Sequence, residues 1–347
     1  MTLRDALPRA WYSDARWLRW LQPVSQLYGA LARRRRQAWQ GGNKTPYRAA
    51  LPVVVIGNIA VGGTGKTPLT LALCRYLQAR GLKPAIVSRG YGGEAPLYPL
   101  YVTRDTPLAH CGDEALLYAR STEVPVVVDP NRARAVARLE CDHAPDLVLC
   151  DDGLQHYALA RDIELVVVDG SRGFGNGLLL PAGPLREPVS RLAEVDYVVV
   201  NADAGLPLPP DSAPRVAMQL VPELLENLAS GECLDSATWL ARYGASVPQV
   251  HAVAGIGNPG RFFRTLTDLG FAIMAHPFPD HHRFQASDLA FADALPIVMT
   301  EKDAVKCLPF ADARHWCLNV RAQLPEAFLQ ALAQRIQALC VQHTVAL

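Results

Sequence analysis

The feature that most constrains the fold is a glycine-rich turn within LPVVVIGNIAVGGTGKTPLTLALCRYLQARG, residues 51–81. Residues 51–56 are almost all apolar and rich in valine, which is typical of a strand buried on both faces. The segment after the turn has helical periodicity, with Pro68 in its first turn and Gly81 just past its end. Between a strand and a helix, backbone N–H groups and the helix dipole can hold a polyphosphate.

The turn carries a phosphate-binding motif with one departure. The residues expected to bind the nucleotide are Gly62, Gly63, Thr64, Gly65, Lys66 and Thr67. The match to G-x-x-x-x-G-K-[ST] fails only at the first position, where Ala60 replaces glycine. We expect Lys66 to reach the β- and γ-phosphates and the Thr67 hydroxyl to hold magnesium. A chance Lys-Thr after a glycine-rich turn is the alternative, which the flanking strand and helix disfavour.

The cysteine pattern and the length bound the class of protein. The eight cysteines occur singly and none forms a C-x-x-C pair, which argues against a zinc ribbon or a disulfide framework. We therefore expect reduced thiols in a cytosolic protein. Half of the 347 residues are apolar, and a chain of this length is typical of two domains.

The net charge of +1 conceals a basic N-terminal segment. Residues 1–48 hold ten Lys or Arg and two Asp, a net charge of +8, so the remaining chain carries −7. Charges interrupt every apolar stretch near the start, and no uncharged apolar run is long enough for a membrane span. The sequence therefore predicts neither a signal peptide nor a transmembrane span.

The same segment has an amphipathic pattern. Its apolar side chains recur at a helical spacing of three and four: Trp17, Trp20, Leu21, Val24, Leu27, Tyr28 and Leu31. Pro23 should kink this element or divide it into two helices. Trp and Arg beside an apolar face favour peripheral binding to a membrane with anionic lipid. The alternatives are a helix packed on the protein's own core and a nucleic-acid surface, which the acidic remainder disfavours.

Strand-like and helical segments alternate in the rest of the chain. Predicted strands cover 84–88, 124–129, 146–150, 163–169 and 195–201, and predicted helices cover 113–120 and 131–143. This alternation predicts a P-loop NTPase-like α/β fold, with a mostly parallel sheet and helices on both faces. Strands at 251–256 and 297–300 and helices at 261–269 and 325–343 indicate a smaller second α/β unit.

We expect three regions along the chain. Residues 1–48 form a basic, Trp-rich helical segment, residues 49–190 a P-loop core domain, and residues 191–347 a C-terminal domain that closes over the site.

Further candidate site residues fall at predicted strand ends and helix starts. DLVLCDDGLQH ends a hydrophobic strand with Asp151 and Asp152, where an acid beside a phosphate loop commonly holds magnesium; a plain turn is the alternative. GDEA places Asp113 and Glu114 at a helix start, where acids are also ordinary dipole partners. SRGYGG carries Arg89, either a catalytic group or part of a plain loop.

Two more segments carry charged residues. PAGPLREP contains Arg186 and Glu187, in a loop near the site or in a linker. A histidine cluster follows in the second half: His276, Asp280, His281 and His282. It lacks a good ligand set for zinc, but a His next to an Asp can serve as a base, a charge partner or a phosphate ligand.

Two classes of protein fit the loop. A membrane-associated switch or partitioning ATPase is the first, but Val61 stands where its dimerising members carry a second lysine. A phosphotransferase is the second, and it needs an acceptor site with a group to receive the hydroxyl proton. The additional Asp, Arg and His residues provide candidates for that group.

A set of motifs resembles one known family. GNIAVGGTGKTP, SRGYGG, GDEA, CDDGLQH, AGPLREP, PDHHRF and TEKDAVK follow one another between residues 57 and 306. In this order they closely resemble the tetraacyldisaccharide 4′-kinases of lipid A synthesis. The final forty residues carry no motif of that set.

The resemblance implies ATP- and magnesium-dependent phosphorylation of the 4′-hydroxyl of a tetraacylated glucosamine disaccharide 1-phosphate. It implies two α/β domains with the active site between them, on a peripheral protein at the cytoplasmic face of the bacterial inner membrane. The basic helix resembles that family's membrane-facing element. Neither nucleic acid nor an obligatory protein partner is expected.

The resemblance also implies roles for individual residues. Asp113 would accept the 4′-hydroxyl proton, supported by His281. Lys66 and the loop amides would bind the phosphates, and Thr67 and the Asp151/Asp152 pair would organise magnesium. Arg186 is similar to a family residue near the phosphates. Glu187 is similar to a family residue near the metal.

Overall fold

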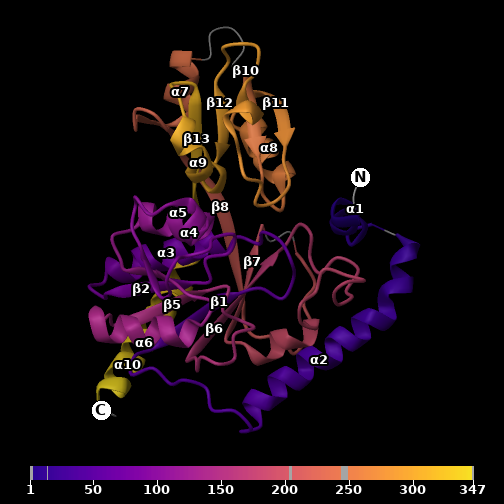
Figure 1. The fold of residues 1–347 in the computed structure, drawn as a ribbon, viewed down its shortest axis with the longest axis vertical. Helices are drawn as coiled ribbons and strands as arrows, with labels where there is room; N and C mark the ends of the chain where they lie inside the picture. The colour runs from indigo at the N-terminus through magenta and orange to yellow at the C-terminus, as the bar shows by residue number, and fades with distance from the viewer. Residues whose placement is uncertain (1–2, 14, 203–204, 244–248, 346–347) are drawn as a thin grey trace.

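The computed structural model describes residues 3–13, 15–202, 205–243 and 249–345. Its strands form one continuous sheet that runs through two packed units, a larger one below and a smaller one above in Figure 1. Across the described chain the strand order is β11-β10-β12-β13-β8-β7-β6-β1-β5-β2-β4-β3, and β9 pairs with β8. Most of these pairings are parallel, so the predicted α/β fold is confirmed.

The larger unit is built on parallel strands whose residues are almost all buried. They are β1 (Val53–Gly57), β2 (Pro84–Ser88), β4 (Val126–Val128), β5 (Leu147–Asp151), β6 (Ile163–Asp169) and β7 (Tyr197–Asn201), with β3 (Leu100–Val102) antiparallel at the edge. Successive side chains point to opposite faces, so Val54 and Val53 belong to different cores. Both faces are covered, which explains why these strands are continuous apolar runs.

Helices cover both faces of this sheet. The core on one face includes side chains of α3 (Lys66–Gln78), α5 (Asp113–Ser121) and α10 (Glu326–Val345). The core on the other face includes α6 (Arg132–Asp142) and the 3-10 helix η2 (Val189–Glu194). The short helix α4 (Leu108–Cys111) directly precedes α5. Because the strands are parallel, the loops that follow β1, β5 and β6 meet at one edge of the sheet.

One long strand, β8 (Arg215–Asn227), belongs to both units (Figure 1). Its first residues pair in parallel with β7, and its later residues pair antiparallel with β13 (His315–Gln323). Helix α10 then returns to the larger unit, where Phe328 meets Tyr197 with ring centroids 5.1 Å apart. The boundary expected after residue 190 precedes β7, which pairs with β6. We therefore propose that β8 is the junction between the units.

The smaller unit repeats the α/β pattern. Its strands besides β13 are β9 (Cys233–Leu234), β10 (Gln249–Ala254), β11 (Ala272–Pro277) and β12 (Ile297–Thr300), and its helices are α7 (Ser236–Tyr243), α8 (Pro259–Asp268), α9 (Glu301–Cys307), η3 (Ala286–Leu289) and η4 (Leu308–Phe310). Trp239 is buried among aromatic rings, with the Trp316 ring centroid 5.8 Å away. This unit therefore has a hydrophobic core of its own.

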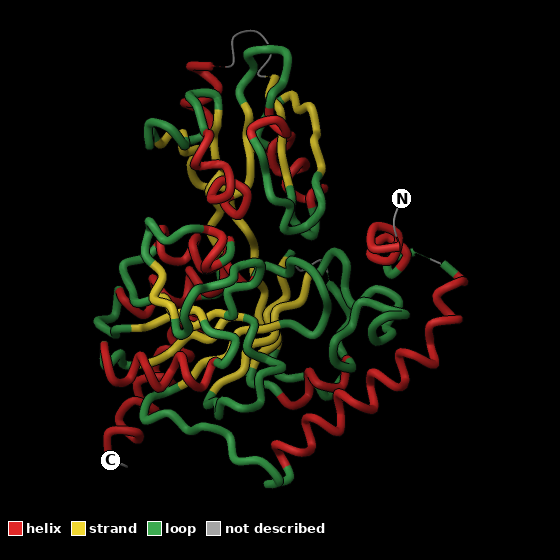
Figure 2. Tube along the Cα trace, viewed as in Figure 1, coloured by secondary structure: helices red, strands yellow, loops and turns green. Residues whose placement is uncertain are grey.

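The N-terminal segment is helical and lies along the larger unit (Figure 2). It comprises α1 (Leu3–Ala10), η1 (Arg16–Leu21) and α2 (Gln22–Gln40). Pro23 lies in the first turn of α2, so the proline divides two helices, as one of the expected outcomes. Ser25 accepts a hydrogen bond from the Ala182 amide at 2.9 Å, and Gly29 faces Leu179. One face of α2 therefore packs on the core.

Other side chains of this segment face solvent. Trp20 is 85% exposed, Leu27 62% and Leu31 58%. Among the described helices, none has the length and apolarity needed to cross a membrane.

Candidate active site

The glycine-rich loop lies between β1 and α3, as expected. Gly65 has a φ of 102°, in the left-handed region that favours glycine. A Cβ at Gly65 would also lie only 2.6 Å from the side-chain amide nitrogen (Nδ2) of Asn201. That nitrogen donates to the Thr64 carbonyl oxygen at 2.9 Å, so the end of β7 holds the loop. Lys66 and Thr67 open α3 and line the adjacent pocket.

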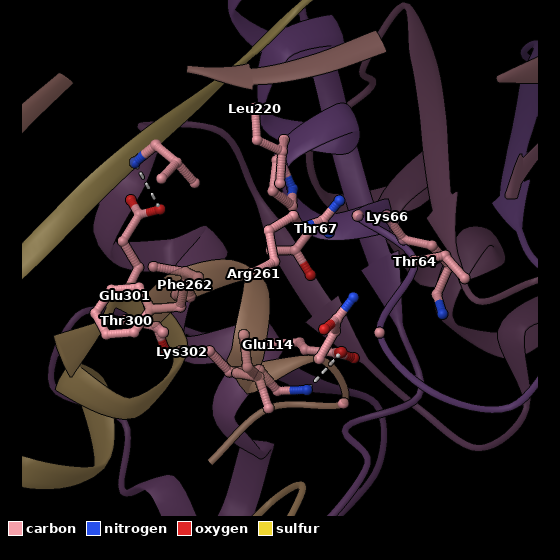
Figure 3. A pocket seen from close by; sticks show the side chains of 18 of the residues that line it. Thr64, Lys66, Thr67, Glu114, Leu220, Arg261, Phe262, Thr300, Glu301 and Lys302 are labelled. Carbon is pink, nitrogen blue, oxygen red and sulfur yellow. Dashed lines mark hydrogen bonds and ion pairs between the residues drawn. The ribbon is translucent and has the colours of Figure 1, made fainter. Parts of the chain in front are cut away.

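This pocket lies between the loop and the smaller unit (Figure 3). Its polar part is lined by Gly63 to Thr67 on one side and by Asn258, Arg261 and Lys302 from the smaller unit. An apolar wall continues from it, formed by Leu71, Leu117, Leu220, Ile256, Phe262, Leu318 and Val320. A polar loop beside an apolar wall suits a nucleotide, because phosphates need donors and a base needs an apolar surface.

Asp152 holds two cations beside the loop. Its carboxylate lies 3.3 Å from the Lys66 ammonium and 3.1 Å from the Arg186 guanidinium. Burial alone would raise the Asp152 pKa, but these two charges outweigh it and hold the pKa well below its usual range. The φ of Asp152 is 47°, a left-handed conformation that is uncommon outside glycine. In this backbone conformation the Asp152 carboxylate faces both Lys66 and Arg186.

Its neighbour Asp151 is in a different state. It is fully buried at the end of β5, and neither carboxylate oxygen has a hydrogen-bond partner among the described residues. Burial, followed by the charge of Glu114, raises its pKa well above the usual range, although Lys66 and the Tyr118 hydroxyl act in the opposite direction. Buried carboxylates without partners are costly, so this group is suited to receive a cation.

Asp113 and His281 meet across the two units. Asp113 begins α5 in the larger unit, and its Oδ2 lies 3.1 Å from Nδ1 of His281 in the smaller unit. Burial raises the Asp113 pKa, but the hydrogen bond with His281 and the charges of Lys302 and Lys306 lower it to about 2. Asp113 is therefore ionised at neutral pH and can accept a hydrogen bond from a hydroxyl.

Lys302 fixes which nitrogen of His281 carries the proton. Its ammonium lies 3.3 Å from Nε2 of His281 and 3.2 Å from Glu114. Burial lowers the Lys302 pKa, but Glu114, Asp113 and further acidic charge raise it above its usual range, so the lysine stays protonated. A charged ammonium can only donate, so Nε2 accepts and Nδ1–H donates to Asp113.

The SRGYGG segment packs against the Asp113–His281 pair. Gly112, just before Asp113, has a φ of 78°, and a Cβ there would lie 2.2 Å from the Tyr91 carbonyl oxygen. The Tyr91 ring lies 4.6 Å, centroid to centroid, from the His281 ring, and the φ of His281 is 59°. Arg89 itself is exposed. The motif therefore positions the Asp113–His281 pair through tight packing.

Glu187 lies in a buried network next to Arg186. Gln155 donates to one carboxylate oxygen at 2.6 Å, Tyr157 donates to the other at 2.9 Å, and Arg191 lies 3.4 Å away. Gln155 also donates to the carbonyl oxygen of Asn58 at 3.1 Å, at the start of the loop. Unlike Asp151, Glu187 has a protein partner on each oxygen.

The histidine cluster separates in space. His276 contacts His251 at 2.9 Å, and His282 contacts Asp288 at 3.0 Å. Asp280 lines the pocket, and only His281 contacts Asp113 among the described residues of the cluster. The described residues contain no group of three or more His, Cys, Asp or Glu side chains placed to hold a metal.

The sequence motifs did not reveal the lysines of TEKDAVK as site residues. Lys302 and Lys306 are four apart on α9, a spacing that places them on one helical face. Lys306 is buried, 2.9 Å from Asp303 and 3.6 Å from Asp113. That spacing was a usable signal, but the acid both lysines face lies in the other unit.

Comparisons with known proteins decide between the two classes. The sequence model of the family described as tetraacyldisaccharide-1-P 4′-kinase matches residues 17–337. The chain belongs to this family. A tetraacyldisaccharide 4′-kinase of Alcanivorax borkumensis is 48% identical over 334 residues, which is 96% of this chain and 98% of that protein. One of Pseudomonas aeruginosa is 47% identical over 339 residues, 98% of this chain and 99% of that protein.

A solved structure agrees with the family. The crystal structure of LpxK from Aquifex aeolicus in complex with ATP matches this fold with a TM-score of 0.77 and 26% identity, covering 93% of this chain and 99% of that one. The kinase class predicted from the motifs is confirmed. The switch or partitioning ATPase is not favoured.

Proposed function

We propose that this kinase transfers the γ-phosphoryl group of ATP to the 4′-hydroxyl of a tetraacylated glucosamine disaccharide 1-phosphate, in lipid A biosynthesis. The observation that carries the proposal is one pocket bordered by the phosphate loop and, through Lys302, by the Asp113–His281 pair. A phosphotransferase needs both parts, because the loop holds the phosphates and the pair receives the acceptor hydroxyl. A nucleotide switch needs the loop and a group that orients water, but no site for an acceptor hydroxyl.

Asp152 directs two cations toward the phosphates of ATP. Lys66 and Arg186 both contact Asp152. The phosphates carry more negative charge than one carboxylate and are also bound by the loop amides and the dipole of α3. In the complex, Asp152 then lies between the two side chains and keeps both aimed at the phosphates.

The residues present fit a magnesium ion. Magnesium usually binds through one or two carboxylates together with substrate phosphates and water, and Asp151 offers two unpartnered buried oxygens. We assign Asp151 and the Thr67 hydroxyl as its protein ligands, with Glu187 supporting the site from beside Arg186. Bound magnesium neutralises charge on the β- and γ-phosphates.

Asp151→Asn should stabilise the nucleotide-free protein in EDTA at pH 8, by on the order of 1–3 kcal/mol. A carboxyl whose folded pKa lies above its unfolded pKa destabilises the fold once the pH exceeds both, and burial raises the Asp151 pKa well above its usual range. The same substitution should remove the stabilisation given by magnesium and ATP together. Thermal unfolding measures both effects.

Asp152→Asn is the matched control, because its carboxylate is paired with Lys66 and Arg186 and its loss should lower stability. If Asp151→Asn were neutral in EDTA and kept the full magnesium response, the assignment of Asp151 as a metal ligand would be wrong.

Asp113 receives the acceptor hydroxyl. The Nδ1–H of His281 holds one Asp113 oxygen, and the Lys302 and Lys306 charges keep the group ionised. An ionised carboxylate orients the 4′-hydroxyl and takes its proton as the bond to phosphorus forms. A low pKa is tolerable because phosphoryl transfer needs little deprotonation before the transition state.

The N-terminal segment docks the kinase on the membrane that holds its acyl substrate, at the cytoplasmic face of the inner membrane. Trp20, Leu27 and Leu31 are exposed, while Ser25 and Gly29 pack on the core. The flanking arginines attract anionic lipid. An apolar face with Trp and Arg is suited to the headgroup boundary.

Replacing Trp20, Leu27 and Leu31 by Glu should abolish co-sedimentation with phosphatidylglycerol vesicles, with little change in thermal stability, because these side chains face solvent. The matched control is Val341→Glu on α10, at a side chain that is 64% exposed. Unchanged sedimentation of the triple variant would mean that the segment does not bind the membrane.

The proposed reaction is tested with γ-labelled ATP and detergent-solubilised tetraacyl disaccharide 1-phosphate, while ATP hydrolysis is followed in parallel. We expect magnesium-dependent labelled lipid. Hydrolysis without labelled lipid, with the acceptor accessible, would favour the ATPase alternative and leave His281 without its role.

A further inference from the structure

One cation in the pocket has no hydrogen-bond or ion-pair partner among the residues that the structure describes. Arg261 lies in the first turn of α8, in the smaller unit, and lines the pocket together with Gly63 to Thr67 of the phosphate loop (Figure 3). Its side chain makes no hydrogen bond or ion pair with any described residue, and its Nη1 atom is buried. Burial lowers the pKa of the guanidinium, and the charge of Asp169 only partly opposes this.

The acid whose charge acts on Arg261, Asp169, is already engaged. Asp169 accepts hydrogen bonds from Arg172 at 3.0 Å, from Ser171 at 2.6 Å and from Asn258 at 3.3 Å. A partly desolvated guanidinium without a counter-ion is unfavourable. The arrangement is favourable once an anion enters the pocket.

The other cations at this site differ in that respect. Lys66 and Arg186 share Asp152, and Lys302 contacts Glu114 at 3.2 Å. Arg261 is therefore the cation of this group whose charge no carboxylate neutralises within the described chain.

Direct contacts hold α8 against the phosphate loop. Arg172 donates to the Gly257 carbonyl oxygen at 2.9 Å and to the Gly63 carbonyl oxygen at 2.6 Å. A Cβ at Gly257 would lie 2.6 Å from the Gly63 amide nitrogen, so the two loops touch. Arg261 lies about one helical turn after Gly257. Its backbone N–H donates to the Asn258 carbonyl oxygen, which fixes the start of α8 beside this contact.

We propose that Arg261 contacts the phosphate chain of ATP from across the junction of the two units and stabilises its charge during transfer. This inference rests on the proposed nucleotide site at the loop. A guanidinium matches phosphate oxygens in a two-bonded fork. An arginine supplied from the same chain is a recurring device in phosphoryl transfer. Arg261 thus makes docking of the smaller unit a condition for catalysis.

Arg261→Met should lower kcat/KM for ATP by at least about 100-fold, and Arg261→Lys should lose less, because it keeps the charge but not the fork. Isothermal titration should show weaker ATP binding with adenosine binding unchanged. Without nucleotide, the Tm of Arg261→Met should equal or exceed that of the parent. Arg264→Met is the matched control, an exposed arginine on the same helix.

Three results would overturn the proposal: Arg261→Met activity equal to that of Arg264→Met, an equal loss of adenosine binding, or a large fall in Tm without nucleotide. Lys66→Ala tests the nucleotide site at the phosphate loop separately from the role of Arg261. If Lys66→Ala is inactive while Arg261→Met is normal, the loop assignment stands and the Arg261 proposal fails. If Lys66→Ala is active, both fail.

Discussion

Lys66→Ala is expected to reduce phosphoryl transfer by about 100- to 1000-fold or more. The Lys66 ammonium is mostly buried, lies beside the loop amides and contacts Asp152 at 3.3 Å. We expect it to neutralise charge on the β- and γ-phosphates of bound ATP, as proposed above. Steady-state transfer from labelled ATP measures the loss.

The control is Lys83→Ala, an exposed lysine directly before β2 that does not line the pocket. It should leave transfer within about twofold of the parent, as ordinary surface substitutions do. Near-normal turnover by Lys66→Ala, in a protein that unfolds at the parental temperature, would reject the phosphate-loop assignment.

Asp113→Ala and His281→Ala should each lower kcat by about 100- to 10,000-fold, and the double variant should be little worse than either single one. The reason is the 3.1 Å hydrogen bond that joins the two side chains, through which His281 acts on Asp113. His281→Ala also removes an interaction that lowers the Asp113 pKa to about 2. The acid limb of its pH–rate profile should therefore move to higher pH.

His282→Ala is the control for this pair, because the neighbouring ring contacts Asp288 at 3.0 Å instead. It should keep parental kcat and an unshifted pH profile. Fully additive losses in the double variant, or an acid limb that does not move in His281→Ala, would show that the two residues act independently.

Much of the fold followed from local pattern. The predicted strand at 84–88 is β2 and the predicted strand at 163–169 is β6, with the same bounds. The helix expected at 113–120 is α5, and the helix expected at 325–343 is α10. These elements could be predicted because buried parallel strands are continuous apolar runs, and because apolar residues recur along a helix with a period of 3.6 residues.

The pairing of strands and the packing of helices that are far apart in the chain could not be predicted from local pattern. Nothing local marks β8 as a strand shared by the two units, since its first residues pair with β7 and its later ones with β13. Nor does the periodicity of α10 reveal that it packs on the larger unit instead of the smaller one. Both depend on partners far away in the chain.

The sequence by itself determined the phosphate loop, the family and the identity of the main charged residues, because those signals lie in short contiguous motifs. Only the tertiary structure decided how the charges are paired. It gave Asp152 two cations and left the Asp151 carboxylate without a hydrogen-bond partner among the described residues. It also selected His281 from its cluster for Asp113 and left Arg261 unneutralised beside the loop. Burial and distance set the state of an ionisable group, and both arise only when separate segments pack together.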